Sequence, residues 1–265
     1  MSSPTHEPWA LILGASSGFG GATALELARS GFHIFGVHLD RRSTMSNVER
    51  IMDEIRAEKR QAVFFNINAA DSEQRRKAAD AMKDHVAGGA HVRVLLHSLA
   101  FGTLRSFVPE SPEEAVTPKQ MDMTLDVMAH SLVYWVQDLL YRALLSKGSR
   151  VFAMTSAGST RVWPSYGPVS AAKAALESHI RQLANELAPK GIAVNAIRAG
   201  VTDTPALRKI PGSDVLLGGA RERNPSGRLT TPEDVAKAIA ALSDERAYWI
   251  NGNVIGVDGA EDIVG

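Results

Sequence analysis

Short apolar runs of strand length alternate along the chain with longer segments in which apolar residues recur at helical spacing. The apolar runs are rich in β-branched residues and span residues 9–13, 33–37, 62–65, 92–97, 150–155, 193–197 and 253–257. The amphipathic segments between them span residues 20–29, 44–58, 72–86, 119–145, 171–187 and 232–242. Alternation repeated this often predicts parallel βαβ units joined by right-handed crossovers. We therefore expect one α/β domain over residues 1–265, with a doubly wound, seven-stranded parallel sheet and helices on both faces.

One segment interrupts this alternation. Residues 202–227 follow the sixth apolar run and are punctuated by glycine and proline. Long insertions of this kind often act as lids or binding loops, and ligands of open α/β sheets bind outside the carboxyl ends of the strands. We predict a substrate-binding lid here, and the alternative is an irregular connection without a function of its own.

A glycine-rich turn follows the first apolar run and opens the first amphipathic segment. Glycines allow a tight turn and a close approach of backbone N–H groups to a pyrophosphate, and the helix N-terminus adds partial positive charge. In this strand–turn–helix context the pattern predicts a Rossmann-type dinucleotide site. The alternative is a turn that serves only the close packing of helix on strand. The turn residues expected to contact the cofactor are Gly14, Ser16, Ser17, Gly18, Phe19 and Gly20.

The end of the second apolar run indicates which nicotinamide dinucleotide is bound. A carboxylate there would accept a hydrogen bond from a ribose 2′-hydroxyl, whereas arginines would pair with a 2′-phosphate. Counted from Gly31, the position where this acid usually falls is occupied by His38, with Asp40 two residues later. Arg41 and Arg42 follow, and guanidinium groups suit phosphate. We therefore predict NADPH rather than NADH, with a solvated loop as the alternative explanation of the arginines.

Composition narrows the function classes. The 265 residues include 29 basic and 29 acidic side chains, so net charge gives no general reason to expect nucleic acid or an anionic membrane as a partner. No cysteine is present, which excludes disulfides, thiolate metal sites and a cysteine nucleophile. No apolar run approaches ~18 residues, and the N-terminal stretch lacks the basic region of a secretory signal. We expect a cytoplasmic protein.

Four motifs together resemble the short-chain dehydrogenase/reductase family over nearly the whole chain. Besides the glycine turn, they are residues 195–200 with Thr204, residues 225–228 and residues 251–259. The resemblance implies a Rossmann fold, a nicotinamide dinucleotide, and a homotetramer packed through the helices at residues 119–145 and 171–187. It also implies further cofactor-binding residues, which are Asn68, Ser98, Ala100, Lys173, Ala199, Gly200, Thr202 and Thr204.

The catalytic signature of that family is altered in this chain. The family usually has Tyr-x-x-x-Lys, with a serine thirteen residues before the tyrosine. Lys173 and Ser156 keep this frame, but Val169 stands in the place of the tyrosine, and Tyr166 lies seven residues before the lysine. Met128 stands where the usual members have an asparagine. The wider spacing, and residues 97–102 after the fourth apolar run, resemble enoyl-[acyl-carrier-protein] reductases of fatty acid synthesis, in a minority subgroup with the usual glycine turn.

The wider spacing suits reduction of a 2-enoyl thioester. On a helix, seven residues turn through about 700°, so Tyr166 and Lys173 share a face, and the tyrosine is anchored ~4.5 Å farther along the axis than in the usual spacing. Hydride would arrive at C3 while negative charge develops on the thioester oxygen, farther from the nicotinamide than a ketone oxygen. We expect Tyr166 to stabilise this enolate oxygen. The resemblance implies that Lys173 binds the nicotinamide ribose, and that Ser156 and Phe101 contact the substrate with Tyr166.

These observations predict an NADPH-dependent enoyl thioester reductase acting on substrates bound to acyl carrier protein, with Tyr166, Lys173 and Ser156 as its catalytic residues. One alternative is a short-chain reductase of ketones or other carbonyl compounds. A second alternative is a dinucleotide-binding regulator without catalysis. His97 has no acidic or histidine partner at ligand spacing, so no metal site is expected.

Overall fold

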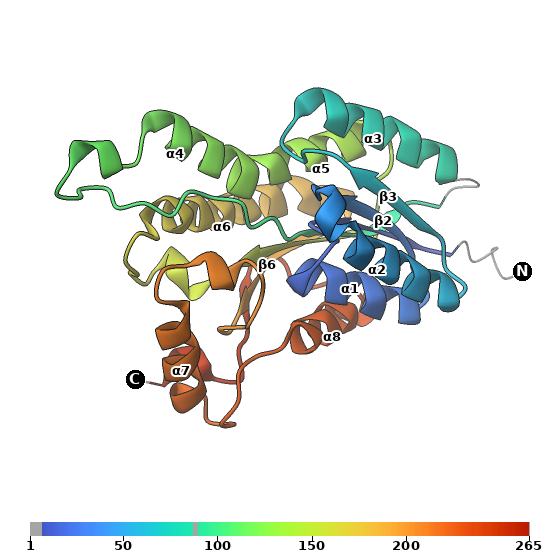
Figure 1. The fold of residues 1–265 in the computed structure, drawn as a ribbon. Coiled ribbons are helices and arrows are strands. Elements are labelled where there is room, and N and C mark those ends of the chain that lie inside the picture. The colour runs from blue at the N-terminus through green and yellow to red at the C-terminus, as the bar shows by residue number, and fades with distance from the viewer. Residues whose placement is uncertain (1–6, 87–89, 265) are drawn as a thin grey trace, which may run out of the picture.

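Seven parallel strands form the central sheet (Figure 1). The computed structural model describes residues 7–86 and 90–264, so the N-terminal stretch considered above lies mostly outside the described residues. The strand order is β3-β2-β1-β4-β5-β6-β7, and the order reverses between β1 and β4, where ligands of such sheets bind. The predicted doubly wound α/β fold is therefore confirmed. The strands are β1 (Trp9–Leu13), β2 (His33–His38), β3 (Ala62–Asn66), β4 (Val92–His97), β5 (Arg150–Thr155), β6 (Ala193–Ala199) and β7 (Val254–Val257).

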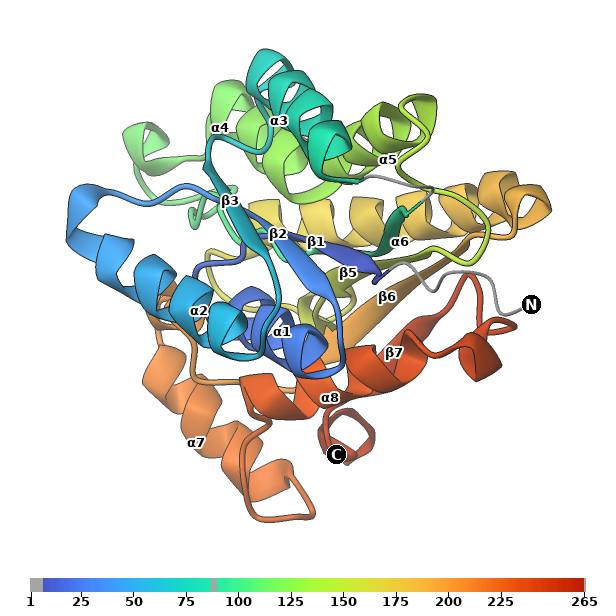
Figure 2. The ribbon, with the colours of Figure 1, turned by 90° about the vertical axis from the view of Figure 1, so that its right-hand side faces the viewer.

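Helices cover both faces of the sheet (Figures 1 and 2). One face packs against α1 (Gly18–Arg29), α2 (Met45–Ala57) and α8 (Pro232–Leu242). The other packs against α3 (Ser72–His85), α5 (Ser131–Tyr141) and α6 (Gly167–Leu187), and α4 (Pro118–Leu125) packs on α6. None of the helices in the described ranges is long and apolar enough to cross a membrane.

The strand residues alternate between the two helix layers. In β1, Leu11 and Leu13 pack into the cluster that contains Trp135 of α5, whereas Ala10 and Ile12 pack into the cluster formed with α1, α2 and α8. This follows from the period of two along a strand. All five residues of β1 are buried, as expected for a parallel sheet covered on both faces. The sheet thus gives a rigid support for the loops at its carboxyl edge.

The helix predicted over residues 119–145 is interrupted and ends earlier. A π-helical turn over Asp126–His130 separates α4 from α5, and α5 ends at Tyr141. The Ser131 hydroxyl donates a hydrogen bond to Val127 O at 2.8 Å beside this turn. Such a bond offers the backbone an alternative to the regular helical pattern, and π turns of this kind often lie at functional sites.

The predicted lid segment contains a helix that the sequence pattern did not indicate. Helix α7 (Ser213–Arg223) begins after Gly212, which has a φ of +75°. Ala220 is its one buried residue, so α7 lacks the apolar stripe on which a helix prediction depends. The loop before it is fixed by Trp163, whose indole N–H donates to Pro211 O at 2.9 Å. Its role as a lid stays a prediction.

Candidate active site

The glycine turn between β1 and α1 forms a cradle for an anion. Gly14 has a φ of +91°, and a Cβ there would collide with the carbonyl oxygen of Ser98; a Cβ at Gly20 would collide with the carbonyl oxygen of Gly14. Ser17 precedes α1, but its side chain caps no backbone N–H, and the first turn contains no acidic side chain. The first N–H groups of α1 are therefore available to a phosphate, which the helix dipole also favours. These residues fit the diphosphate of a dinucleotide.

The loop after β6 borders this turn. Thr204 lies against Gly18, where a Cβ would be 3.6 Å from Thr204 Cγ2. Thr202 is buried, and its hydroxyl donates to Gly200 O at 2.9 Å. The loops after β4 and β6, which the sequence analysis assigned to the cofactor, thus meet the glycine turn at the carboxyl edge of the sheet.

Other predicted cofactor residues lie at the rim of this region. Asn68 follows β3 and is exposed, and its Oδ1 accepts the Ala70 N–H at 3.0 Å. Ala100 is exposed, whereas Ala199 is half-buried at the end of β6. Ser16 is held in the glycine turn by Asn47 of α2, whose amide donates to the Ser16 carbonyl oxygen. Direct contact of these residues with a dinucleotide stays a prediction.

The end of β2 carries both an acidic and a basic group. The buried His38 ring contacts the Asp40 carboxylate at 3.0 Å through Nδ1. Burial raises the pKa of the Asp40 carboxyl, but hydrogen bonds from Thr44, Ser16 and His38 outweigh burial and lower it. Arg41 and Arg42 are exposed, and neither guanidinium is paired with a carboxylate of a described residue. The carboxylate is therefore engaged by protein groups, while both guanidinium groups are available.

Tyr166 and Ser156 lie together at the end of β5. Tyr166 directly precedes α6, and its ring packs so closely on Gly158 that a Cβ there would approach the ring carbons and lie 3.2 Å from Ser156 Oγ. Burial raises the pKa of Tyr166, and the nearby Ser156 hydroxyl opposes this effect. Ser156 Oγ is buried, yet it forms no hydrogen bond of full geometry with the described residues. A buried polar atom whose hydrogen bonding is incomplete fits a site that a substrate oxygen completes.

Lys173 lies on α6 and reaches back to β5. It is 6% exposed, and its ammonium donates to Met154 O at 2.6 Å. Burial lowers the pKa of Lys173 to about 8, against the opposing effect of Glu177. The Glu177 carboxylate accepts a hydrogen bond from Thr155 Oγ1 at 2.6 Å. Glu177 was not among the predicted site residues. Its position four residues after Lys173 places both side chains on one helix face, which would have indicated it.

His97 is buried behind these groups rather than exposed to a ligand. It is the last residue of β4, has no exposed surface, and contacts Ser131 Oγ through Nε2 at 2.8 Å. Burial, and secondarily the charge of Lys173, lower the pKa of His97 to about 3. Its Nδ1 has no hydrogen-bond partner among the described residues. In the described part of the chain, no group of three or more His, Asp or Glu side chains could hold a metal ion.

An apolar cluster contains Tyr166 together with residues of α4, the π-helical turn and α6. Val169 is 5% exposed and packs with Met128, Ala172 and the partly buried Tyr166. The residue in the usual place of the family tyrosine is therefore an aliphatic side chain in contact with other apolar groups. Phe101, by contrast, lies at the surface with 61% of its area exposed. Its contact with substrate stays a prediction.

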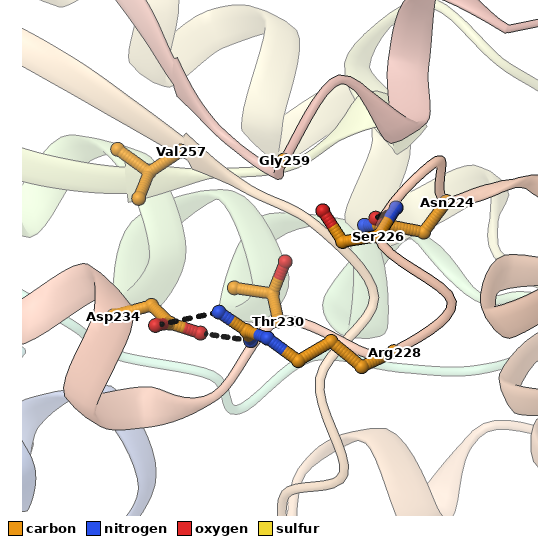
Figure 3. A pocket seen from close by; sticks show the side chains of 7 residues that line it. All are labelled: Asn224, Ser226, Arg228, Thr230, Asp234, Val257 and Gly259. Carbon is orange, nitrogen blue, oxygen red and sulfur yellow. Dashed lines mark hydrogen bonds and ion pairs between the residues drawn. The ribbon is translucent and has the colours of Figure 1, made fainter.

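A polar pocket lies at the end of β7, beside the start of α8 (Figure 3). Its volume is about 200 Å³. Arg228 spans it and forms a two-point ion pair with Asp234, at 2.5 and 3.1 Å. None of the predicted site residues lines it. The lining residues are Asn224, Ser226, Arg228, Thr230, Asp234, Val257 and Gly259.

Comparison with known proteins connects this geometry to a family. A family model described as enoyl-(acyl carrier protein) reductase matches residues 14–260. The 1-cyclohexenylcarbonyl-CoA reductase of Streptomyces collinus is 28% identical over 278 residues, which cover 100% of this chain and 92% of that protein. The enoyl-[acyl-carrier-protein] reductase [NADH] of Escherichia coli K12 is 33% identical over 149 residues, 56% of each chain.

Solved structures show the same fold. The crystal structure of the enoyl-[acyl-carrier-protein] reductase (NADH) of Aquifex aeolicus VF5 matches with a TM-score of 0.84 and 24% identity, over 97% of both chains. The family match runs from the glycine turn through the loop after β6 to the end of β7. This chain is therefore an oxidoreductase of the short-chain dehydrogenase/reductase family, which binds nicotinamide dinucleotides, and it resembles the enoyl-acyl carrier protein reductases within that family.

Proposed function

We propose that this protein reduces the carbon–carbon double bond of 2-enoyl thioesters. The observation that carries the proposal is the placement of Tyr166 directly before α6, beside Ser156 and at the start of the helix that holds Lys173. The usual tyrosine position holds Val169, which is buried among apolar side chains and cannot donate a proton. The hydrogen-bond donor is thereby displaced toward the start of α6, as expected for an oxygen three bonds from the carbon that accepts hydride, against one bond in a ketone.

The side chains then have distinct parts in the reaction. A bound reduced nicotinamide supplies hydride to C3 of the enoyl group. Tyr166 donates a hydrogen bond to the thioester oxygen as negative charge develops there, and burial, which raises its pKa, keeps the phenol protonated near neutral pH. The enolate then takes up a proton from solvent at C2, which completes the reduction of the double bond. Ser156 Oγ, which lies beside Tyr166 and forms no hydrogen bond of full geometry with the described residues, supplies a second polar contact to the same substrate. Lys173 binds the nicotinamide ribose and keeps positive charge close to the enolate.

We further propose NADPH as the reductant. Arg41 and Arg42 are exposed and free of carboxylate partners at the end of β2, where a 2′-phosphate would lie. Asp40 is occupied with His38, so its carboxylate is less available to a ribose hydroxyl. The names of the Escherichia coli and Aquifex aeolicus relatives specify NADH for those proteins, which makes the choice an experimental question for this chain.

We propose acyl carrier protein as the natural carrier of the substrate. The description of the matching family model supports this carrier. The name of the Streptomyces collinus relative specifies a coenzyme A thioester for that protein. Both carriers therefore belong in the first assay.

The direct test follows NADPH oxidation with crotonyl thioesters of acyl carrier protein and of coenzyme A, for the parent protein and Tyr166→Phe. We expect turnover by the parent and a loss of about 100-fold or more in kcat for Tyr166→Phe, because the donor to the enolate oxygen is removed. Tyr248→Phe is a matched control, since Tyr248 is 62% exposed and follows Glu245, which pairs with Arg93 near the amino end of β4.

Three outcomes would count against the proposal. A parent protein that binds NADPH, leaves both thioesters unchanged and reduces small ketones is a carbonyl reductase. Binding without turnover of either class would indicate a regulator. Full activity of Tyr166→Phe would remove Tyr166 from the mechanism.

A further inference from the structure

The short tail after β7 contacts three segments of the candidate site. It contains two adjacent acidic residues, Glu261 and Asp262, in a single helical turn over Glu261–Ile263. Ala260 precedes them with a φ of +71°, a left-handed conformation that disfavours residues other than glycine. Glu261 is nevertheless buried, with 7% of its surface exposed. A buried carboxylate after a strained turn is costly unless its contacts stabilise something specific.

Glu261 fixes the loop that follows β6. Its Oε2 accepts the Val201 N–H at 3.1 Å. Gly200 lies so close that a Cβ there would come within 2.9 Å of the same oxygen. The other carboxylate oxygen, Oε1, is 3.9 Å from Arg223 Nη2 of α7. One side chain therefore connects the loop that fits the cofactor with the helix of the predicted lid.

Asp262 fixes the loop that precedes α6. Its Oδ1 lies 2.9 Å from Arg161 Nη2, and its Oδ2 lies 3.0 Å from Arg198 Nη2 at the end of β6. The Arg161 guanidinium also donates to the Asp262 carbonyl oxygen at 2.7 Å. Arg161 stands between Ser156 and Tyr166 in the chain, so this contact restrains the segment that carries both side chains.

We propose that Glu261 and Asp262 are positioning residues, Glu261 for the cofactor loop through Val201, and Asp262 for the Ser156–Tyr166 loop through Arg161. Neither residue touches a reacting atom in this proposal. Loops that are ordered before a ligand arrives lose less entropy on binding, and sites held by a supporting shell keep their geometry. The role of Glu261 requires only dinucleotide binding, whereas the role of Asp262 rests on the proposed thioester reduction.

The test of Glu261 is a direct titration of the full protein with NADPH, without thioester. Glu261→Ala should raise the Kd about 10-fold, the order expected when a buried N–H loses an ionised acceptor. Glu261→Gln should remain within about threefold of the parent, because its amide oxygen still accepts the Val201 N–H. Ile263→Ala is the control, since Ile263 is in the same turn and is 83% exposed.

An Ala variant that binds NADPH as tightly as the parent would overturn the role of Glu261. Thermal unfolding of each apoprotein shows whether the variant is folded. If Glu261→Ala does not fold, Glu261→Asp replaces it, because the shorter side chain withdraws the carboxylate from Val201 and should weaken NADPH binding in the same way.

The test of Asp262 separates kcat from cofactor binding. Asp262→Asn and Arg161→Gln should each lower kcat on the crotonyl thioester about 10-fold, with the NADPH Kd unchanged. The losses should be less than additive in the double variant, because each substitution removes the same Arg161–Asp262 ion pair. An unchanged kcat in either single variant, or losses in kcat that add in the double variant, would refute this role. A parent without thioester turnover would refute the proposed function and this role, and the Glu261 titration would still stand by itself.

Discussion

Burial gives Lys173 and Tyr166 opposite changes in proton affinity. Lys173 is enclosed beside β5, so its pKa falls to about 8, within reach of ordinary assay conditions. The phenol of Tyr166 is also desolvated, so its pKa rises and it stays protonated over the same range. A pH profile between neutral and mildly alkaline conditions therefore reports on the lysine and not on the tyrosine.

We expect kcat/KM for NADPH to fall as pH rises above about 8. A lysine with a lowered pKa is charged below that pKa and neutral above it, so its attraction to the cofactor is lost on the alkaline side, by about tenfold per pH unit. The profile is measured from pH 6.5 to 9.5 with saturating thioester. Lys173→Arg, which remains charged, should bind less well but lose the decline. The same decline in that variant would assign it to another group.

In the proposed function, the connection from β2 to α2 selects between the two cofactors. His38 and Asp40 pair at the carboxyl end of β2, and the two arginines after them project without carboxylate partners among the described residues. Their position follows from the sheet order, which places β2 beside β1 and its glycine turn. A phosphate on the ribose would therefore meet free guanidinium groups.

Replacing Arg41 and Arg42 together by alanine should lower kcat/KM for NADPH by about 10- to 100-fold and change that for NADH by less than about threefold. Charge-assisted hydrogen bonds to phosphate are of this strength, and NADH lacks the phosphate. The comparison uses both cofactors on both proteins. Arg50→Ala is the control, because Arg50 is exposed on α2 and paired with Glu54. A parent that prefers NADH would instead assign the ribose to Asp40.

The packing of α5, α6 and the π-helical turn encloses His97, which has no exposed surface. Its ring is held between the carboxyl end of β4 and the π-helical turn, in contact with Ser131. An imidazolium there would be desolvated and close to the Lys173 charge. In the folded protein His97 therefore stays neutral until the pH approaches about 3. This makes His97 a determinant of acid stability.

The free energy of unfolding should fall by about 1 kcal/mol between pH 7 and 5.5 because of His97. Its pKa is about 3 when folded, against ~6.5 in an unfolded chain. The unfolded state therefore takes up the proton first, and stability is lost as pH falls below ~6.5. Urea unfolding at both pH values measures the loss. His97→Gln keeps a donor for Ser131 and should reduce the loss; an unchanged loss would exclude His97 as its source.

The positions that sequence could predict are those governed by local pattern. The runs at residues 9–13, 92–97 and 150–155 match β1, β4 and β5 to the residue, because β-branched runs bounded by turns leave little choice of structure. Helix α7 was missed because it has one buried residue, and the π turn was missed because hydrophobic periodicity does not indicate it. Glu177 was missed although its spacing from Lys173 indicated it, and Glu261 was missed because its contact with Val201 depends on the tertiary fold.

The alternation of apolar runs and amphipathic segments, the glycine turn and the seven-residue spacing from Tyr166 to Lys173 were sufficient to determine the fold class, the family and the candidate catalytic pair. These features depend on local periodicity and on the reach of neighbouring residues along one strand, turn or helix. The tertiary structure alone decided the contacts between remote segments. It buried Lys173 against β5, enclosed His97, and brought Glu261 to Val201 across 60 residues of sequence. Burial and charge at such contacts depend on packing in three dimensions, which no local pattern specifies.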